Sequence, residues 1–201
     1  MLRSFTIRKK IFLALLLMGL LPLSLAMVVS VLDSSRALEN AVYQQLTSIR
    51  EIKKGQVEAY FKERKDDLGQ LAEIVQLRQF SHLERNNSQE ITTEAEKAYV
   101  DFQKNGGYYD LFLIDVSGDI FYTVEREPDF GTNLINGPYA QSNLSMLFRE
   151  VIQTKKFGVT DFSPYAPSAG AAAAFIAMPV LNQAGQVRMV VALQLSIDQI
   201  N

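Results

Sequence analysis

The feature that most constrains this chain is an uncharged apolar segment near its start. It runs from Ile11 to Leu32 and consists mostly of leucine, valine, alanine and methionine. A helix needs about 20 apolar residues to cross the hydrocarbon core of a membrane. Residues 11–32 are therefore predicted to form a transmembrane helix, in which Pro22 is expected to cause a kink rather than a break.

Basic residues flank this segment unequally. Four precede it and one follows closely, namely Arg3, Arg8, Lys9, Lys10 and Arg36. Lysine and arginine are retained on the cytoplasmic side of a membrane. This bias predicts that residues 1–10 are cytoplasmic and that everything from residue 33 onward lies outside the cytoplasmic membrane.

A cleaved signal peptide is the alternative for the same segment, since a basic start and an apolar core are common to both. Ser24-Leu25-Ala26 has the small-x-small pattern of a cleavage site. However, the apolar run is longer than the roughly 7–15 residues of a signal core, and it continues past that site to Leu32. The membrane anchor is therefore favoured.

A long stalk helix is predicted over residues 33–80. Proline is absent from Ser34 to Phe80, and apolar residues recur at intervals of three, four or their sums, as on one face of a helix. Such a helix would be on the order of 65 Å long, too long for a small domain to cover. We therefore expect it to form a homodimer with a second copy. The apolar positions are Leu38, Val42, Leu46, Ile49, Val57, Tyr60, Leu68, Leu71 and Val75.

Charged residues form runs on the opposite face of this helix, and we interpret them as a solvated surface. Lys53 and Arg64 fall on the apolar face and interrupt it.

An α+β module is predicted over residues 81–201. A helix is expected from about Ser88, as N-cap, to Lys104, and Asn105-Gly106-Gly107 ends it. The apolar period then changes from 3.6 to 2. The pattern indicates a five-stranded antiparallel sheet packed by helices on one face. Its expected elements are strands 109–115 and 120–124, a helix at 143–154, a strand near 159–162, and strands 172–181 and 187–196.

The composition excludes several classes of function. The chain has no cysteine, a single histidine (His82) and a formal net charge of −2. Disulfides, thiolate metal sites and most zinc sites are therefore excluded, and no concentrated basic face favours nucleic acid. We find no catalytic motif of a hydrolase and no phosphate-binding glycine loop. The sequence predicts neither an enzyme nor a cofactor.

Two loops of the predicted module, residues 125–139 and 161–170, are unusual for connections. Each combines proline and glycine with aromatic and charged side chains. Long loops beside a rigid sheet are where ligand sites tend to be built. The alternative is that proline and glycine fix turns while the aromatic residues cap the core.

The residues of these segments resemble the Cache domains of bacterial methyl-accepting chemotaxis proteins, and the resemblance covers nearly the whole chain. It is carried by residues 115–119, 122–134, 161–165 and 175–180. It implies a PAS-like sheet after a transmembrane and a long helix, and residues 195–201 look like the end of a first lobe. The chain is thus expected to stop before a second lobe.

The resemblance implies extracytoplasmic sensing of a small molecule and signal transduction across the inner membrane, in the N-terminal part of a chemotaxis receptor. The alternative is the same input region on a sensor histidine kinase or a nucleotide cyclase. Neither output domain falls within the sequence.

The resemblance also implies that the ligand lies between the sheet and the two loops. Some family members hold an amino-acid carboxylate with an Arg-x-Trp-aromatic motif. This chain has Arg126-Glu127-Pro128 and no tryptophan, so the amino-acid assignment is not carried over. Because of their charges, Arg126 would bind an anionic group of the ligand and Asp161 a cationic group, through charge-assisted hydrogen bonds. The alternative for each residue is a salt bridge at the surface or one that braces a loop. The remaining candidates are Tyr122, Asp129, Tyr139, Tyr165 and Ser168.

Overall fold

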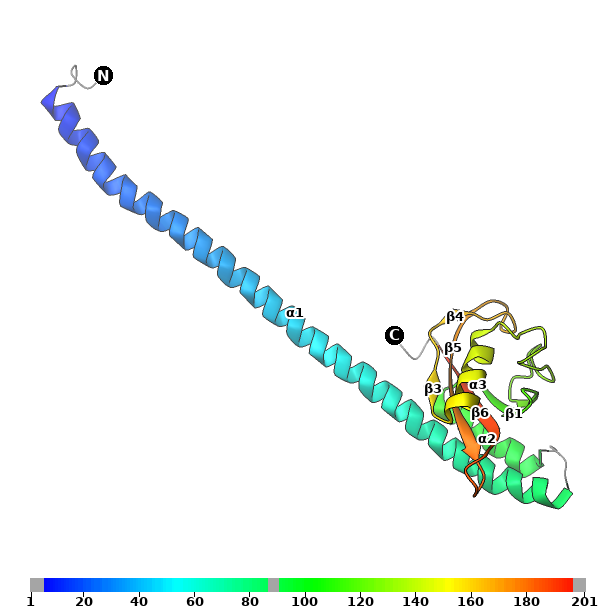
Figure 1. Cartoon of the computed structure of the whole chain (residues 1–201). Coiled ribbons are helices and arrows are strands. Elements are labelled where there is room, and N and C mark those ends of the chain that lie inside the picture. Colours follow the sequence, from blue (N-terminus) through cyan, green and yellow to red (C-terminus); the bar gives the residue numbers. More distant parts are fainter. Residues whose placement is uncertain (1–5, 87–90, 197–201) are drawn as a thin grey trace. The chain divides into compact units, whose positions relative to one another are not determined.

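The computed structural model describes residues 6–86 and 91–196 (Figure 1). The chain divides into two compact units, Met1–Glu58 and Ala59–Asn201. Helix α1, Ile7–Asn86, belongs to both units.

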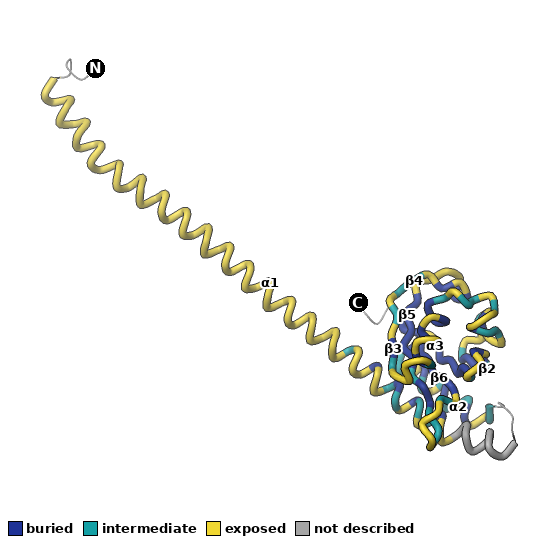
Figure 2. Tube along the Cα trace, viewed as in Figure 1, coloured by how far each residue is buried: buried dark blue, intermediate teal, exposed yellow. Residues whose placement is uncertain are grey.

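The first unit is helical from Ile7 onward. All residues from 6 to 58 are exposed, including the apolar ones (Figure 2). The helix continues through Pro22. By length and composition, α1 is the one helix among the described residues that could cross a membrane. The position of residues 11–32 in a membrane stays a prediction.

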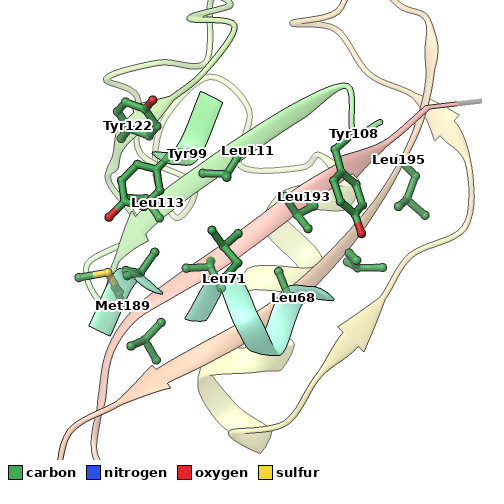
Figure 3. Close-up of a cluster of buried hydrophobic side chains, with 14 of the residues drawn as sticks. Leu68, Leu71, Tyr99, Tyr108, Leu111, Leu113, Tyr122, Met189, Leu193 and Leu195 are labelled. Atoms are coloured by element: carbon green, nitrogen blue, oxygen red, sulfur yellow. The ribbon is translucent and has the colours of Figure 1, made fainter. Parts of the chain in front are cut away.

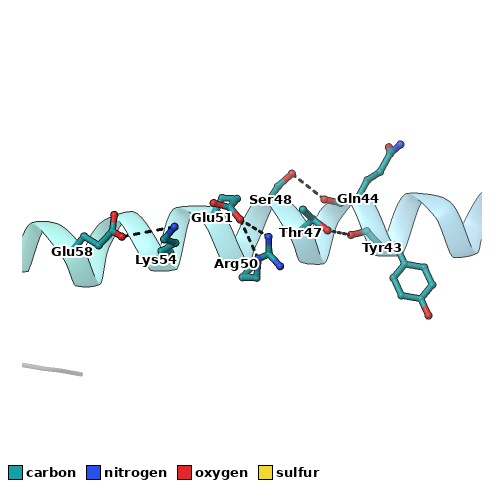
Figure 4. Close-up of polar contacts among 8 residues, drawn as sticks. All are labelled: Tyr43, Gln44, Thr47, Ser48, Arg50, Glu51, Lys54 and Glu58. Carbon is teal, nitrogen blue, oxygen red and sulfur yellow. Dashed lines mark hydrogen bonds and ion pairs between the residues drawn. The ribbon is translucent and has the colours of Figure 1, made fainter. Parts of the chain in front are cut away.

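Several polar side chains of the first unit form hydrogen bonds or ion pairs within the helix (Figure 4). Thr47 and Ser48 donate hydrogen bonds to backbone carbonyl oxygens one turn earlier, at 2.9 and 3.0 Å. Lys54 and Glu58 form an exposed ion pair at 3.9 Å. Exposed pairs of this kind contribute little to stability, which agrees with a solvated charged face.

The second unit begins at Ala59, within the stalk helix that the sequence predicts over residues 33–80. The reason is that the last part of α1 packs on the sheet. Leu68 and Leu71 are fully buried there (Figure 3), and so is Val75. Part of the apolar face predicted for dimerisation is thus covered within the same chain.

Arg64 does not merely interrupt that apolar face. Its side chain is buried, and Nη1 donates a 3.1 Å hydrogen bond to the Gly106 carbonyl oxygen. Its Nη2 lies 3.4 Å from Asp67 Oδ2, which accepts a 2.7 Å hydrogen bond from the Tyr108 hydroxyl. The guanidinium also lies 5.2 Å from the centroid of the Tyr108 ring. Arg64 therefore joins α1 to the turn at Gly106 and Tyr108.

Helix α2, Thr93–Gly106, begins later than predicted. Its N-cap is Thr92, whose hydroxyl accepts a 3.2 Å hydrogen bond from the Ala95 N–H. Ser88, the predicted N-cap, lies outside the described residues. The helix ends at Gly107 with φ 68°, a left-handed conformation that glycine adopts without steric strain.

The sheet of the second unit is antiparallel throughout. Five strands run in the order β2 (Ile120–Thr123), β1 (Asp110–Asp115), β6 (Val187–Leu195), β5 (Ala172–Leu181) and β3 (Gly158–Val159). The short β4 (Ser163–Pro164) pairs separately with β5. Two short strands, β3 and β4, take the place of the single strand expected near 159–162. The elements are β1 Asp110–Asp115, β2 Ile120–Thr123, α3 Asn143–Thr154, β3 Gly158–Val159, β4 Ser163–Pro164, β5 Ala172–Leu181 and β6 Val187–Leu195.

Helices cover both faces of the sheet, whereas the sequence predicted one. Helices α1 and α2 pack on the face that carries Leu111 and Leu193. Helix α3 packs on the face that carries Phe112 and Ala192. The physical reason lies in β1, β5 and β6, which are apolar and buried on both sides. Alternate side chains of a strand point to opposite faces, so both faces need a cover.

Candidate functional site

The candidate site lies at the end of the sheet where β1 begins and β6 ends. The register pairs Asp110 with Gln194, so two polar residues from apolar strands lie opposite each other. Both are buried. The loops 125–139 and 161–170 follow from β2 and β3 and contribute further side chains to the same end.

Asp110 is held by backbone donors. Its Oδ1 accepts hydrogen bonds from the N–H groups of Leu111, Val124 and Glu125 at 2.6, 2.9 and 3.1 Å. Its Oδ2 is buried and accepts none from the protein. Burial raises the pKa of Asp110 to about 7, although the backbone donors oppose the rise.

Asp129 and Tyr165, two of the predicted candidates, are in direct contact. The Tyr165 hydroxyl donates a 2.5 Å hydrogen bond to Asp129 Oδ2, and both residues are fully buried. Asp129 Oδ1 accepts no hydrogen bond from the protein. Burial raises the pKa of the Asp129 carboxyl, and the Tyr165 hydrogen bond opposes this. The Tyr165 ring is fixed edge-on against Phe175, with 4.9 Å between the ring centroids.

Ser168, a third candidate, links the two loops to β6. Its hydroxyl donates a 2.6 Å hydrogen bond to Glu127 Oε2 and accepts a 3.2 Å hydrogen bond from Gln194 Nε2. The Tyr109 hydroxyl donates to the other Glu127 oxygen at 2.8 Å. Gln194 Oε1 is buried and accepts no hydrogen bond from the protein. We call Asp110, Asp129 and Gln194 the acceptor cluster, since each has a buried oxygen without a donor.

Arg126 and Tyr122 are placed differently. Arg126 is exposed at φ 51°, its Nη2 lies 3.2 Å from Glu96 Oε1, and its guanidinium lies over the Phe130 ring. The contact between Arg126 and Glu96 is a salt bridge of the kind expected as the alternative to ligand binding by Arg126. Tyr122 is buried on the α1 and α2 face against Tyr99. Burial raises its pKa to about 12.

Tyr139 and Asp161 lie nearer the surface. Tyr139 is half-buried and Asp161 is exposed. Neither side chain makes a hydrogen bond or ion pair with another residue in the described ranges. The ligand-binding role of all seven predicted residues stays a prediction.

The sequence reasoning missed Asp110, Gln194 and Glu127. A signal for the first two was present, because each is a polar residue inside an apolar strand pattern. In residues 6–86 and 91–196, no group of three or more aspartate, glutamate or histidine side chains is placed to hold a metal ion.

Neither a protein-family model nor a curated protein matches the chain. Several solved structures do. The sensor domain of the Vibrio cholerae histidine kinase DctB matches with TM-score 0.52 and 16% identity over 79% of this chain and 58% of that one. The ligand-binding domain of the Campylobacter jejuni chemoreceptor Tlp3, in complex with 4-methylisoleucine, matches with TM-score 0.59 and 8% identity over 75% of this chain and 56% of that one.

The ligand-binding domain of the Pseudomonas aeruginosa amino acid chemoreceptor PctC, in complex with GABA, matches with TM-score 0.54 and 15% identity over 78% of this chain and 62% of that one. The chain thus spans between 56% and 62% of these three structures. At such low identities the likeness is one of fold. The chain has the α+β fold of Cache-type, PAS-like sensor domains.

Proposed function

We propose that this chain is the membrane-anchored, extracytoplasmic sensory part of a bacterial signal transducer and that it binds a small molecule at the acceptor cluster. The observation that carries the proposal is the set of three buried oxygens without donors, Asp110 Oδ2, Asp129 Oδ1 and Gln194 Oε1. A buried acceptor without a partner costs about 1–3 kcal/mol. A ligand that donates hydrogen bonds there would remove this cost.

The chemistry of the cluster favours a ligand rich in N–H donors. The cluster combines two carboxyl groups and one amide oxygen, and no basic side chain pairs with either carboxyl among the described residues. An ammonium group satisfies such oxygens with charge-assisted hydrogen bonds, which are about twice as strong as neutral ones. Ligand binding would favour one of two arrangements of the lobe, and α1 would pass the displacement on.

Matched probes test this part of the proposal on the full chain in lipid nanodiscs. Butylamine, butyramide and butyrate share one size and differ in charge. We expect butylamine to raise the unfolding midpoint most, because a ligand selective for the folded state stabilises it by mass action. A broader screen with amino acids, purines and polyamines then extends the search for the natural ligand.

Isosteric variants localise the binding. Asp110→Asn and Asp129→Asn keep an acceptor oxygen but remove the charge, and we expect each to weaken binding of the best compound about 10- to 100-fold. Asp101→Asn, on the exposed surface of α2, is the matched control. Unchanged binding in both cluster variants would refute this site while leaving the fold intact.

The anchoring of the chain rests on its first apolar segment. A membrane helix with a basic cytoplasmic flank would hold residues 33–201 outside the cytoplasmic membrane. Alkaline phosphatase fused after Asn201 should then be active. A mature form that begins near Met27, or activity of a C-terminal reporter only in the cytosol, would contradict the anchor.

Dimerisation through α1 is a further part of the proposal. Val42, Leu46 and Ile49 are exposed in the first unit and spaced at helical intervals. Single cysteines at these positions should crosslink two copies. A uniform absence of crosslinks would count against the dimer.

The output could belong to a chemotaxis receptor, a histidine kinase or a nucleotide cyclase. The structural neighbours include both chemoreceptors and a histidine kinase. We favour the chemotaxis receptor because of the resemblance of residues 122–134 and 161–165 to that family. The coding sequence downstream of Asn201 decides between them.

A further inference from the structure

A hollow in the surface lies at the other end of β5 from the acceptor cluster. Its volume is about 420 Å³, and it is open to solvent. Its lining comes from α1, from the segment after α3 and from β5. The lining residues are Lys65, Lys155, Lys156, Phe157, Met178, Pro179 and Leu181.

The sheet leaves this place uncovered for a structural reason. Strand β3 pairs with β5 only at Ala177 and Ile176. Beyond that point, residues 178–181 of β5 form an edge of the sheet. Pro179 in this edge has no N–H to offer to another strand, which discourages extension of the sheet by a further strand.

All the charge on the hollow is positive. The lining contains three lysines and neither aspartate nor glutamate. Within the described ranges none of the three ammonium groups lies within ion-pair distance of a carboxylate. Lys155 Nζ donates a 3.3 Å hydrogen bond to the Gly185 carbonyl oxygen, and Lys65 Nζ lies 5.9 Å from the centroid of the Phe157 ring.

The floor between the lysines is apolar. Pro179 is buried, whereas Phe157, Met178 and Leu181 are half-buried and keep part of their surface open. Apolar surface of this kind gains about 25 cal/mol for each Å² that a ligand removes from water. A purely inorganic anion would leave that surface wet, so the lining suits an anion with an apolar body.

We infer that this lysine-rimmed hollow binds a small organic carboxylate with an aliphatic or aromatic body, at a second site separate from the acceptor cluster. The carboxylate would accept hydrogen bonds from the lysine ammonium groups, and the body would cover Phe157 and Met178. Lys155 caps α3 in the left-handed region at φ 55°, where glycine or asparagine is the usual choice.

The test uses the full chain in nanodiscs of zwitterionic lipid and 3-(4-fluorophenyl)propionate as the probe, followed by fluorine NMR. The primary amide of the probe is the uncharged match, and inorganic phosphate is the match without an apolar body. We expect saturable binding of the carboxylate, weaker binding of the amide, and no displacement by phosphate at the same concentration.

Charge-matched variants localise the probe. Lys65→Gln combined with Lys156→Gln removes two rim charges and should weaken binding roughly 2- to 30-fold, at about 0.2–1 kcal/mol for each exposed charge pair. Lys97→Gln combined with Lys104→Gln removes two exposed charges of α2 and should leave binding unchanged. Asp129→Asn should also leave it unchanged, which separates this site from the proposed sensory site.

Any one of several outcomes would overturn the inference. These are the absence of saturable binding, equal binding of the amide, equal weakening by the two lysine pairs, and loss of binding in Asp129→Asn. Tighter binding of hexaglutamate than of the probe would also overturn it, because an acidic protein segment would then be the better occupant.

Discussion

Replacement of Asp110 by asparagine is expected to stabilise the second unit near neutral pH and to leave its stability almost unchanged in acid. The carboxyl is buried, and its pKa rises from 3.8 to about 7 in the folded protein. The folded state therefore binds the proton more tightly than the unfolded chain does. The stabilisation from this proton is complete below about pH 4 and is lost as the pH rises through about 7.

The size of the effect follows from the two pKa values. A gap of roughly 3 pKa units at about 1.4 kcal/mol per unit corresponds to roughly 4 kcal/mol, which is an upper limit. Asparagine keeps an oxygen for the N–H groups of Leu111, Val124 and Glu125. It resembles the protonated acid and never takes the buried negative charge, so its stability lacks this dependence on pH.

Urea unfolding of the full chain in detergent, followed by near-ultraviolet circular dichroism of its tyrosines, measures the difference. The free energy of unfolding of Asp110→Asn should exceed that of the unmodified chain by up to roughly 4 kcal/mol near pH 8, and the two should agree near pH 4. Asp101→Asn, at an exposed position, is the control. A difference between variant and unmodified chain that does not change with pH would refute the reasoning.

Four further variants can be measured by the same unfolding assay. Tyr165→Phe removes the hydrogen bond to Asp129 and should lower the free energy of unfolding by about 1.5–3 kcal/mol; an unchanged value would mean that the bond contributes nothing. Gly107→Ala should lower the free energy of unfolding by about 1 kcal/mol, because Gly107 has φ 68°. Gly69→Ala, whose added Cβ meets no atom within 4 Å, should raise it by about 0.5–1 kcal/mol. A rise for Gly107→Ala together with a fall for Gly69→Ala would contradict the assigned helix cap. Arg64→Met should destabilise by about 1–3 kcal/mol by leaving the Gly106 carbonyl without its donor, and full stability in this variant would show that the contact is dispensable.

The acceptor cluster couples stability to the proposed function. An ionised Asp110 is unfavourable in the empty site near neutral pH, because burial disfavours its charge. A ligand with a positive charge would offset this penalty and would bind more strongly as the pH rises through about 7. The folded state with an empty site is then less stable than it would be with an uncharged residue at this position. Such a loss of stability is common at functional positions.

The sequence alone determined the elements that local chemistry controls. Helix 143–154 and strand 172–181 have the predicted bounds, and the two hairpins fall where their turn residues are. Apolar periodicity and turn chemistry act over a few residues, so they can be interpreted without knowledge of the fold. The prediction of a membrane helix over residues 11–32 is of the same local kind, because it depends only on the length and composition of that segment.

Only the tertiary structure decided how distant residues meet. The pairing of β1 with β6 places Asp110 opposite Gln194, and the loop after β4 brings Tyr165 to Asp129. The cover on the second face of the sheet and the burial of Arg64 also depend on packing between remote segments. Periodicity shows which side chains share a face but not what lies against that face, because non-local contacts have no signature within a single segment.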